Sequence, residues 1–208
     1  MSPSISPSSS VSPSPSPGFA EYTREASGSL PADDTDLSTA YTEAEIDKTT
    51  RESNQDVDVE DDIGQTGTGY LLHQFKSFIG AALAFGIEFS GESTLSLSSN
   101  PAFLQIYNHT TNLWETITTN TICLPEITFE LTGSIPDSTK YVNADNVISV
   151  RVYQHSATPA TFAVDLYRVL LPAVYTAQYP ANPAVYTAQY PATGSQYIRK
   201  YPPTSYSK

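Results

Sequence analysis

The sequence has few of the residues that cross-link small proteins or bind metals. Its 208 residues include a single cysteine, Cys123, which excludes an intramolecular disulfide framework and a zinc site built from several thiolates of one chain. The histidines His73, His109 and His155 fall in or beside separate predicted strands or turns, and none has a second ligand at the spacing of a metal site. We therefore expect no cofactor and no bound metal.

Basic residues are also scarce. Ten Lys and Arg stand against 22 Asp and Glu, which gives a net charge of −12 and an isoelectric point near 4.4. This balance argues against a nucleic-acid partner held by phosphate contacts. The charge is uneven, at −11 for residues 1–69, −4 for 70–171 and +3 for 172–208. The opposite signs at the two ends predict a weak, salt-screened attraction between copies.

Long hydrophobic runs and an export signal are missing too. The longest apolar stretch, residues 78–89, contains two glycines and is about half the length that crosses a bilayer, so no membrane insertion is expected. Residues 1–17 lack the basic start, the continuous apolar stretch and the cleavage site of a secretory signal. A role outside the cell would require release by lysis, within a virion or by another secretion route.

No catalytic motif is recognisable. The Gly-x-Ser-x-Gly turn that marks many nucleophilic serines is absent. Residues 64–69 have the glycine spacing of a phosphate-binding loop, but they follow an acidic run and precede a strand, so we interpret them as a flexible entry to the folded region. Glycoside hydrolysis needs two facing carboxylates, but carboxylates on the solvent face of strands are far commoner, and we expect no enzyme. The candidate carboxylates are Glu88, Glu92, Glu115, Glu126 and Glu130.

The first 69 residues divide into a spacer and an acidic segment. Residues 1–17 consist almost entirely of Ser and Pro, which predicts a disordered spacer. Residues 18–69 carry 14 acidic and 3 basic side chains, and we expect a partly ordered lead-in with a helical turn at 42–48. The alternating acids of residues 56–62 suit a hard cation, but the glycine and glutamate of a calcium loop are missing, so a solvated linker or a strand edge is favoured.

Residues 70–171 have the pattern of a β domain. Short runs rich in aromatic and β-branched residues alternate with turn residues at a spacing of about 8–12, which predicts an all-β antiparallel β-sandwich of jelly-roll type. Residues 103–108 and 113–117 read as a hairpin with a polar tip. On the last strand, Asp165 is expected to pair with Arg151 across the sheet. The predicted strands are 71–75, 81–89, 103–108, 114–118, 127–131, 147–154 and 161–170.

Residues 172–208 contain a repeat. Residues 172–182 return as 183–193 with ten of eleven positions identical. Two copies are too few for a solenoid, so we predict an extended arm that packs on another subunit, as a strand donated to a sheet edge does. The tyrosines assigned to this assembly arm are Tyr175, Tyr179, Tyr186, Tyr190, Tyr197 and Tyr201.

The chain's one tryptophan allows two interpretations. An exposed Trp114, with nearby Tyr107, can stack on a sugar ring, whereas an inward Trp114 fills the core. Core packing is favoured for Trp114, and glycan stacking by Trp114 and Tyr107 is the alternative.

Several runs resemble a known group of domains. The runs are residues 103–108 leading to 113–117, then 147–153 and 163–166, and their order resembles the galactose-binding-like and carbohydrate-binding-module jelly rolls. The Ser/Pro leader, the acidic lead-in and residues 73–76 together resemble uncharacterised proteins of environmental bacteria and their phages. No sugar-binding or calcium-binding residue carries over by position.

These features predict a non-enzymatic structural or interaction protein. We expect a self-assembling or particle-attached surface component, such as a virion decoration, a tail protein or an extracellular filament, whose partners are further copies or other particle subunits. The alternative is a carbohydrate-binding module with a glycan as its partner. A third interpretation takes the Tyr/Pro/Lys tail of residues 201–208, which is similar to mussel-type adhesive peptides, as an adhesive.

Overall fold

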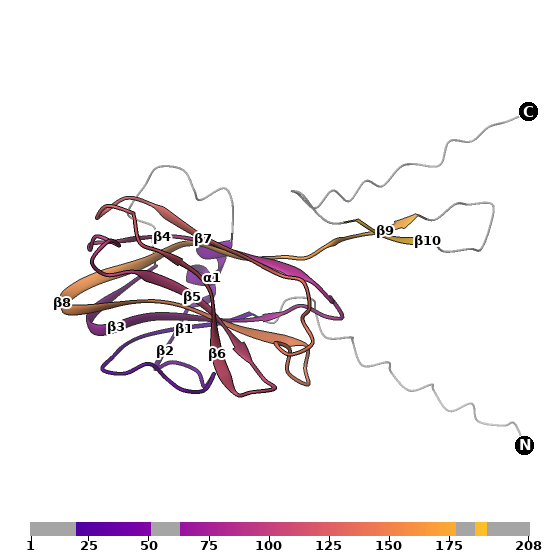
Figure 1. The fold of residues 1–208 in the computed structure, drawn as a ribbon, viewed down its shortest axis with the longest axis horizontal. Coiled ribbons are helices and arrows are strands. Elements are labelled where there is room, and N and C mark those ends of the chain that lie inside the picture. Colours follow the sequence, from indigo (N-terminus) through magenta and orange to yellow (C-terminus); the bar gives the residue numbers. More distant parts are fainter. Residues whose placement is uncertain (1–19, 51–62, 178–185, 191–208) are drawn as a thin grey trace, which may run out of the picture.

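The structure is a computed structural model that describes residues 20–50, 63–177 and 186–190. Among these residues no helix is long and apolar enough to cross a membrane. The elements, shown in Figure 1, are β1 (Ala20–Ser27), β2 (Thr39–Ala40), α1 (Glu43–Thr50), β3 (Ile63–Phe78), β4 (Phe85–Ser93), β5 (Ala102–Asn108), β6 (Leu113–Asn120), β7 (Phe129–Ile135), β8 (Val147–Leu170), β9 (Ala173–Ala177) and β10 (Tyr186–Tyr190).

Strands β3 and β8 join the two layers of a sandwich. Residues 69–78 of β3 pair antiparallel with 147–156 of β8, and residues 63–67 pair with 160–164. The first half of β8 also pairs with β5, and its second half pairs with β4. The first layer therefore runs β2-β1-β3-β8-β5-β6, and the second contains the other ends of β3 and β8 with β4 and β7 (Figure 1). The predicted all-β antiparallel sandwich is confirmed.

The interior between the layers is rich in aromatic rings. Phe75 of β3 stacks on Tyr167 of β8, with ring centroids 4.0 Å apart. Phe89 of β4 lies 6.1 Å from Phe162 of β8 and 5.9 Å from Phe129 of β7. All five side chains are buried. Burial of each such side chain contributes roughly 1.5–3 kcal/mol relative to exposure, so this cluster holds the layers together.

The sandwich begins earlier than residue 70, where we predicted its start. β1 pairs with β3 from Ala20 opposite Ser77 to Ser27 opposite Tyr70. Its acids, Glu21 and Glu25, lie on one face of the strand with Thr23, and Tyr22 on the other face is buried in the core. The acidic residues of this strand obscured the alternation of inward and outward side chains that would have predicted it.

The glycines of residues 64–69 are part of β3 and do not form a flexible entry. A Cβ on Gly67 would lie 2.6 Å from the Cβ of Ala26, so β1 and β3 approach closely because that side chain is missing. Gly69 has φ +83° beside a register shift, and a Cβ there would lie 2.4 Å from the Ser27 carbonyl oxygen.

The predicted strands 147–154 and 161–170 are one strand, β8. Pro159, in the gap between the two predicted strands, lies where the pairing of β3 with β8 is interrupted between Ser156 and Ala160. The predicted Asp165–Arg151 pair is wrong. Asp165 accepts a hydrogen bond from Ser90 Oγ at 3.1 Å and lies at a bulge where the pairing of β4 skips from Leu166 to Val164.

Two local predictions are confirmed. The hairpin pairs β5 with β6 from Ala102 opposite Asn120 to Asn108 opposite Leu113. The helical turn at 42–48 is α1, which begins with a capping box: Glu45 Oε2 accepts from Thr42 N at 2.7 Å, and Thr42 Oγ1 accepts from Glu45 N at 3.3 Å.

The two repeat copies pair with each other. Residues 173–177 of β9 run antiparallel to 186–190 of β10, with Tyr175 opposite Ala188 and Tyr186 opposite Ala177. These strands form a separate two-stranded sheet beside the sandwich (Figure 1). Tyr190 is opposite Ala173. The spacer 1–17, the acidic run 56–62 and the arm residues Tyr179, Tyr197 and Tyr201 lie outside the described residues.

Candidate functional site

A row of polar side chains crosses the outer face of the first layer. Strand register places Thr23, Gln74, Arg151, Gln105 and Thr116 side by side on β1, β3, β8, β5 and β6. Three of the five residues, Arg151, Gln105 and Thr116, are hydrogen bonded to one another in series. Arg151 Nε donates to Gln105 Oε1 at 2.8 Å, and Gln105 Nε2 donates to Thr116 Oγ1 at 2.9 Å. We call these five residues the polar row.

Aromatic rings flank the polar row on both sides. Phe103 stacks on Tyr153 with centroids 5.0 Å apart, and Tyr107 meets Trp114 edge to face at 5.2 Å. The Arg151 guanidinium links the two pairs, because it lies 4.2 Å from the Trp114 ring and 5.6 Å from the Tyr153 ring. The polar row and these four aromatic residues form a surface that we call the platform.

The structure brings together the two residues predicted to stack on a glycan. Trp114 does not lie between the layers, so the favoured core position is wrong; its side chain is half-buried on the outer face. Tyr107 is buried beside it, with 5% of its surface exposed. Sequence reasoning missed Gln74, Gln105 and Arg151. Their signal is a long polar side chain in mid-strand, two positions from an apolar one on the same face.

The loop between β1 and β2, residues 28–38, lies over the platform; we call it the strap. Its backbone carbonyls accept hydrogen bonds from platform side chains. Arg151 Nη1 donates to Pro31 O at 2.7 Å, Trp114 Nε1 donates to Asp33 O at 3.0 Å, and Gln74 Nε2 donates to Asp34 O at 2.9 Å. The carbonyl oxygens of the strap therefore act as acceptors for the hydrogen-bond donors of the platform.

Side chains also hold the strap in place. Leu37 is buried against Leu72 and Tyr153. Asp34 Oδ2 accepts from Ser149 Oγ at 2.7 Å, and Asp36 forms an ion pair with Lys76. The residues between Pro31 and Leu37 are exposed or half-exposed, so this part of the strap rests on the surface without burying its own side chains.

The polarity beneath the strap is unusual in two respects. Arg151 is 4% exposed and, among the described residues, forms no ion pair with a carboxylate. Burial lowers the pKa of its guanidinium to about 10. Gln74 is 1% exposed, and its Oε1 has no hydrogen-bond partner among the described residues. A buried acceptor left unpaired costs about 1–3 kcal/mol, which points to a role other than stability.

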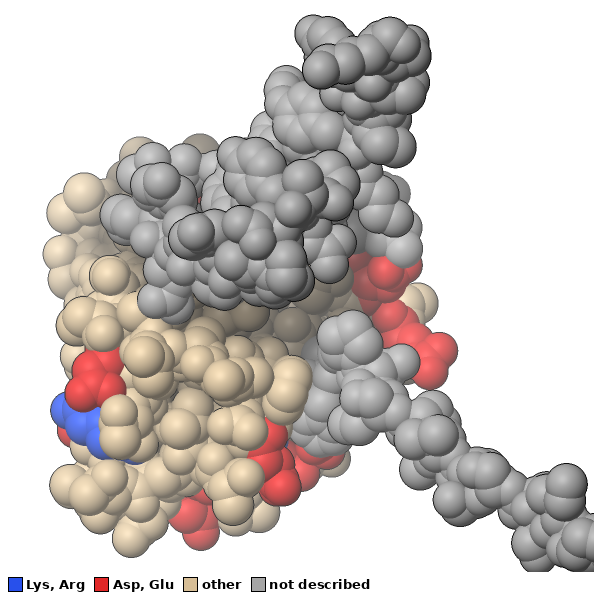
Figure 2. Space-filling model, turned by 90° about the vertical axis from the view of Figure 1, so that its right-hand side faces the viewer, with Lys and Arg blue, Asp and Glu red and all other residues tan. Residues whose placement is uncertain are grey.

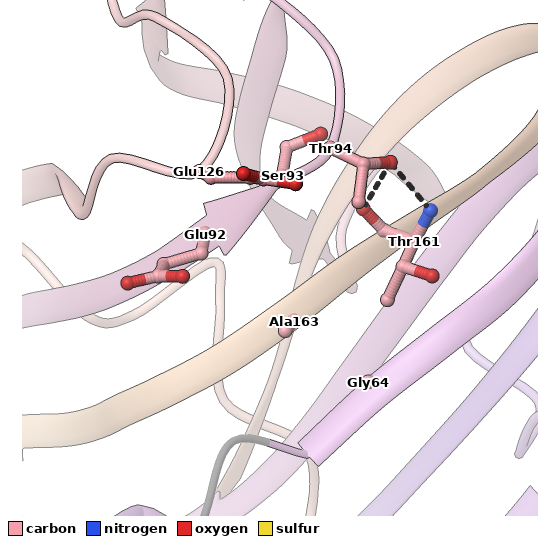
Figure 3. A pocket seen from close by; sticks show the side chains of 7 residues that line it. All are labelled: Gly64, Glu92, Ser93, Thr94, Glu126, Thr161 and Ala163. Atoms are coloured by element: carbon pink, nitrogen blue, oxygen red, sulfur yellow. Dashed lines mark hydrogen bonds between the residues drawn. The ribbon is translucent and has the colours of Figure 1, made fainter. Parts of the chain in front are cut away.

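A hollow lies on the other layer, and we call it the second hollow to keep it apart from the platform. It has a volume of about 540 Å³, and none of the described residues that line it is aromatic (Figure 3). Thr94 and Thr161 bond to each other across it, with Thr161 N donating to Thr94 Oγ1 at 2.9 Å, while the Glu92 carboxylate points away from them and accepts from Thr128 Oγ1 at 3.0 Å. The lining residues are Gly64, Glu92, Ser93, Thr94, Glu126, Thr161 and Ala163.

The other candidate carboxylates have structural partners or lie on the surface. Glu88 pairs with Arg168 at 2.7 Å. Hydrogen bonds from Asn108, Tyr141 and Lys140 lower the pKa of Glu115 to about 2. Glu130 is exposed.

The histidines lie apart. His73 is buried in the core, where it bonds to the Tyr41 hydroxyl and the Phe162 carbonyl. His109 lies against Tyr107, and His155 against Tyr70. Within the described ranges no three His, Cys, Asp or Glu gather as metal ligands.

The charged groups also form no basic patch on the described part of the face in Figure 2. Acidic side chains appear at several separate places and basic ones at one. Most of this described surface is uncharged.

The chain has distant likenesses among solved structures. No protein-family model and no curated protein matches it. It is similar to the carbohydrate-binding module TmCBM61 in complex with β-1,4-galactotriose, with TM-score 0.37 and 10% identity over 53% of this chain and 70% of the other. It is similar to a family 16 carbohydrate-binding module, with TM-score 0.37 and 11% identity over 52% and 75% of the two chains. The enzymatically active domain of bacteriophage CBA120 tailspike protein 4 matches with TM-score 0.28 and 10% identity over 53% and 18%.

The resemblance to carbohydrate-binding-module sandwiches expected from the sequence is thus confirmed, and a phage protein is among the matches. Likenesses of this size assign no ligand and no site residue to this chain.

Proposed function

We propose that the sandwich is a non-catalytic carbohydrate-binding domain and that the platform is its ligand site. The observation that carries this proposal is the polar row with aromatic rings on both sides, built from five strands of one face. Ligand sites combine apolar and aromatic surface with a few placed polar groups, and the platform has this composition.

The chemistry of the platform suits a polyhydroxylated ligand. Each sugar hydroxyl both donates and accepts hydrogen bonds, and the amides of Gln74 and Gln105, which flank Arg151 in the polar row, offer both roles. The C–H face of a sugar ring can stack on the half-buried Trp114 or Phe103. No carboxylate belongs to the platform, so it has no acid–base pair for glycoside hydrolysis.

Calorimetric titration with a panel of soluble hexasaccharides (cello-, xylo-, manno- and galactohexaose) tests the proposal. At least one should bind, and Gln105→Ala should weaken it by about tenfold, the loss expected for one or two hydrogen bonds. Glu126→Gln, which changes the second hollow alone, is the matched control and should bind as the original protein does. Equal binding by both variants would show that the ligand site is not on the platform. Absence of binding across the panel would count against the carbohydrate-binding function.

We also propose that the repeat arm makes contacts between copies or with other subunits of a surface particle. The supporting observation is the β9–β10 pair, because a two-stranded sheet alone is marginally stable in water and gains stability by docking on another edge. An extracellular or virion surface would bring both the platform and this arm to their partners. Light scattering of the full chain tests the contact between copies.

A further inference from the structure

We propose that the strap is a built-in occupant of the platform and that a carbohydrate binds by displacing it. This inference rests on the carbohydrate-binding function proposed above and adds its regulation. The strap contacts the same donors that a ligand would use, on Arg151, Trp114 and Gln74. Two of these residues are buried beneath the strap, with Arg151 at 4% and Gln74 at 1% exposure.

The strap imitates a ligand through its backbone. The acceptors are the carbonyl oxygens of Pro31, Asp33 and Asp34, and Thr35 O accepts a second bond from Gln74 Nε2 at 3.3 Å. A hydroxyl oxygen accepts the same bonds with similar geometry. The donors of the platform therefore have acceptors both in the strap-covered state and in the ligand-bound state.

The strap is an incomplete substitute. Carbonyl oxygens cannot donate, and Gln74 Oε1 is buried beneath the strap without a partner among the described residues. Rotating the amide by 180° does not help, because it would turn this oxygen toward the carbonyls of Asp34 and Thr35. A sugar hydroxyl can donate to Gln74 Oε1 while another accepts from Nε2. A hydroxyl-bearing ligand therefore satisfies an atom that the strap leaves unpaired.

The contacts of the strap allow it to leave the outer face of the first layer. Its one deep anchor is Leu37, 6% exposed, at the end next to β2. At the other end Gly28 is exposed, and the wide range of backbone angles open to glycine lets the chain pivot there. Between these ends the half-buried Leu30 packs against the cluster of Leu37, Leu72 and Tyr153. The other contacts are hydrogen bonds and the Asp36–Lys76 pair, which salt weakens.

Deletion of residues 29–36 across a Gly-Gly link uncovers the platform and tests the proposal without a ligand. The emission of Trp114 should shift to longer wavelength because the indole gains water and loses Asp33 O. An unchanged spectrum in a folded variant would show that the strap does not cover the platform. Leu37→Ala is the milder variant should the deletion fail to fold.

Titration of the original protein and of Leu37→Ala with the hexasaccharide panel completes the test. An occupant that must leave reduces the apparent affinity by the open fraction, so Leu37→Ala should bind several-fold more tightly. Bound saccharide should speed hydrogen exchange at the amides of Leu37 and Ser38, which donate to Thr23 Oγ1 and Glu25 Oε2. Equal affinity with unchanged exchange would overturn displacement but leave carbohydrate binding intact. Absence of binding in both proteins would overturn the proposed function itself.

Discussion

The guanidinium of Arg151 lies 4.2 Å from the ring of Trp114, and both side chains donate hydrogen bonds to the strap above them. Arg151 is thus a buried cation stabilised by dipoles and aromatic faces, with no carboxylate of the described residues in an ion pair with it. Such an arrangement is costly for stability alone, because burying a charge requires full hydrogen bonding. The cost in stability has a functional reason if the same donors hold a ligand in place.

Removing the Arg151 guanidinium should affect both stability and binding. Arg151→Ala loses two charged hydrogen bonds and leaves Gln105 Oε1 unpaired, so we expect a loss of about 2–4 kcal/mol in the free energy of unfolding. Arg151→Lys keeps the charge but loses the planar fork and should recover part of the stability and little of the binding. Urea unfolding followed by Trp114 emission measures the first effect. Unchanged stability in Arg151→Ala would contradict this role.

Two glycines near the end of β1 should respond differently to a methyl group. Gly69→Ala places a Cβ against Ser27 O at a φ of +83°, so we expect a loss of about 2 kcal/mol or more. Gly28→Ala meets no atom within 4 Å and should change the free energy of unfolding by less than about 0.5 kcal/mol. Equal midpoints in urea for the two variants would show that β1 does not pack on β3 as described.

Acid should destabilise the protein through His73. Burial lowers the pKa of His73 to about 4 from 6.5, and the neutral ring donates through Nε2 to Phe162 O while Nδ1 accepts from Tyr41. The unfolded chain therefore binds the proton more readily than the folded one. The free energy of unfolding should be highest above pH 6.5 and fall by about 3 kcal/mol as the pH drops to 4.

Urea titrations from pH 4 to pH 8 measure this dependence. His73→Gln should flatten the curve, whatever its effect on absolute stability. His155→Gln, on an exposed histidine, is the control and should keep the slope. A slope that survives in His73→Gln would assign the dependence to other groups.

Removal of the repeat arm tests the assembly proposal. A chain ending at residue 171 keeps every strand of the sandwich, so it should unfold at the same urea concentration as the full chain. Its mass by light scattering should be that of a monomer, whereas the full chain should form larger species. A monomeric full chain would contradict assembly through the arm.

Much of the fold could be predicted from local sequence, but the site could not. Alternating apolar residues and turn residues gave the hairpin of β5 and β6 and the class of the fold. They failed for β1, where Glu21 and Glu25 masked a strand, and for β8, which was predicted as two strands with residues 155–160 between them.

The local signal of the platform, a long polar side chain in mid-strand, does not tell which residues meet. Thr23, Gln74 and Arg151 are far apart in the chain and meet only through the register of their strands. Trp114 was placed on the wrong side because β5 and β6 carry apolar residues on both faces, and alternation alone does not tell which face is the interior.

The indole N–H of Trp114 offers the most direct test of ligand binding at the platform. The chain has one tryptophan, so a ¹⁵N-correlated NMR spectrum contains one such indole peak, from a proton that Asp33 O accepts. Titration with the hexasaccharide that calorimetry identifies should move this peak saturably, with the calorimetric affinity, because its acceptor changes from a carbonyl to a hydroxyl. A saccharide that binds by calorimetry while the indole peak stays in place would contradict binding at the platform.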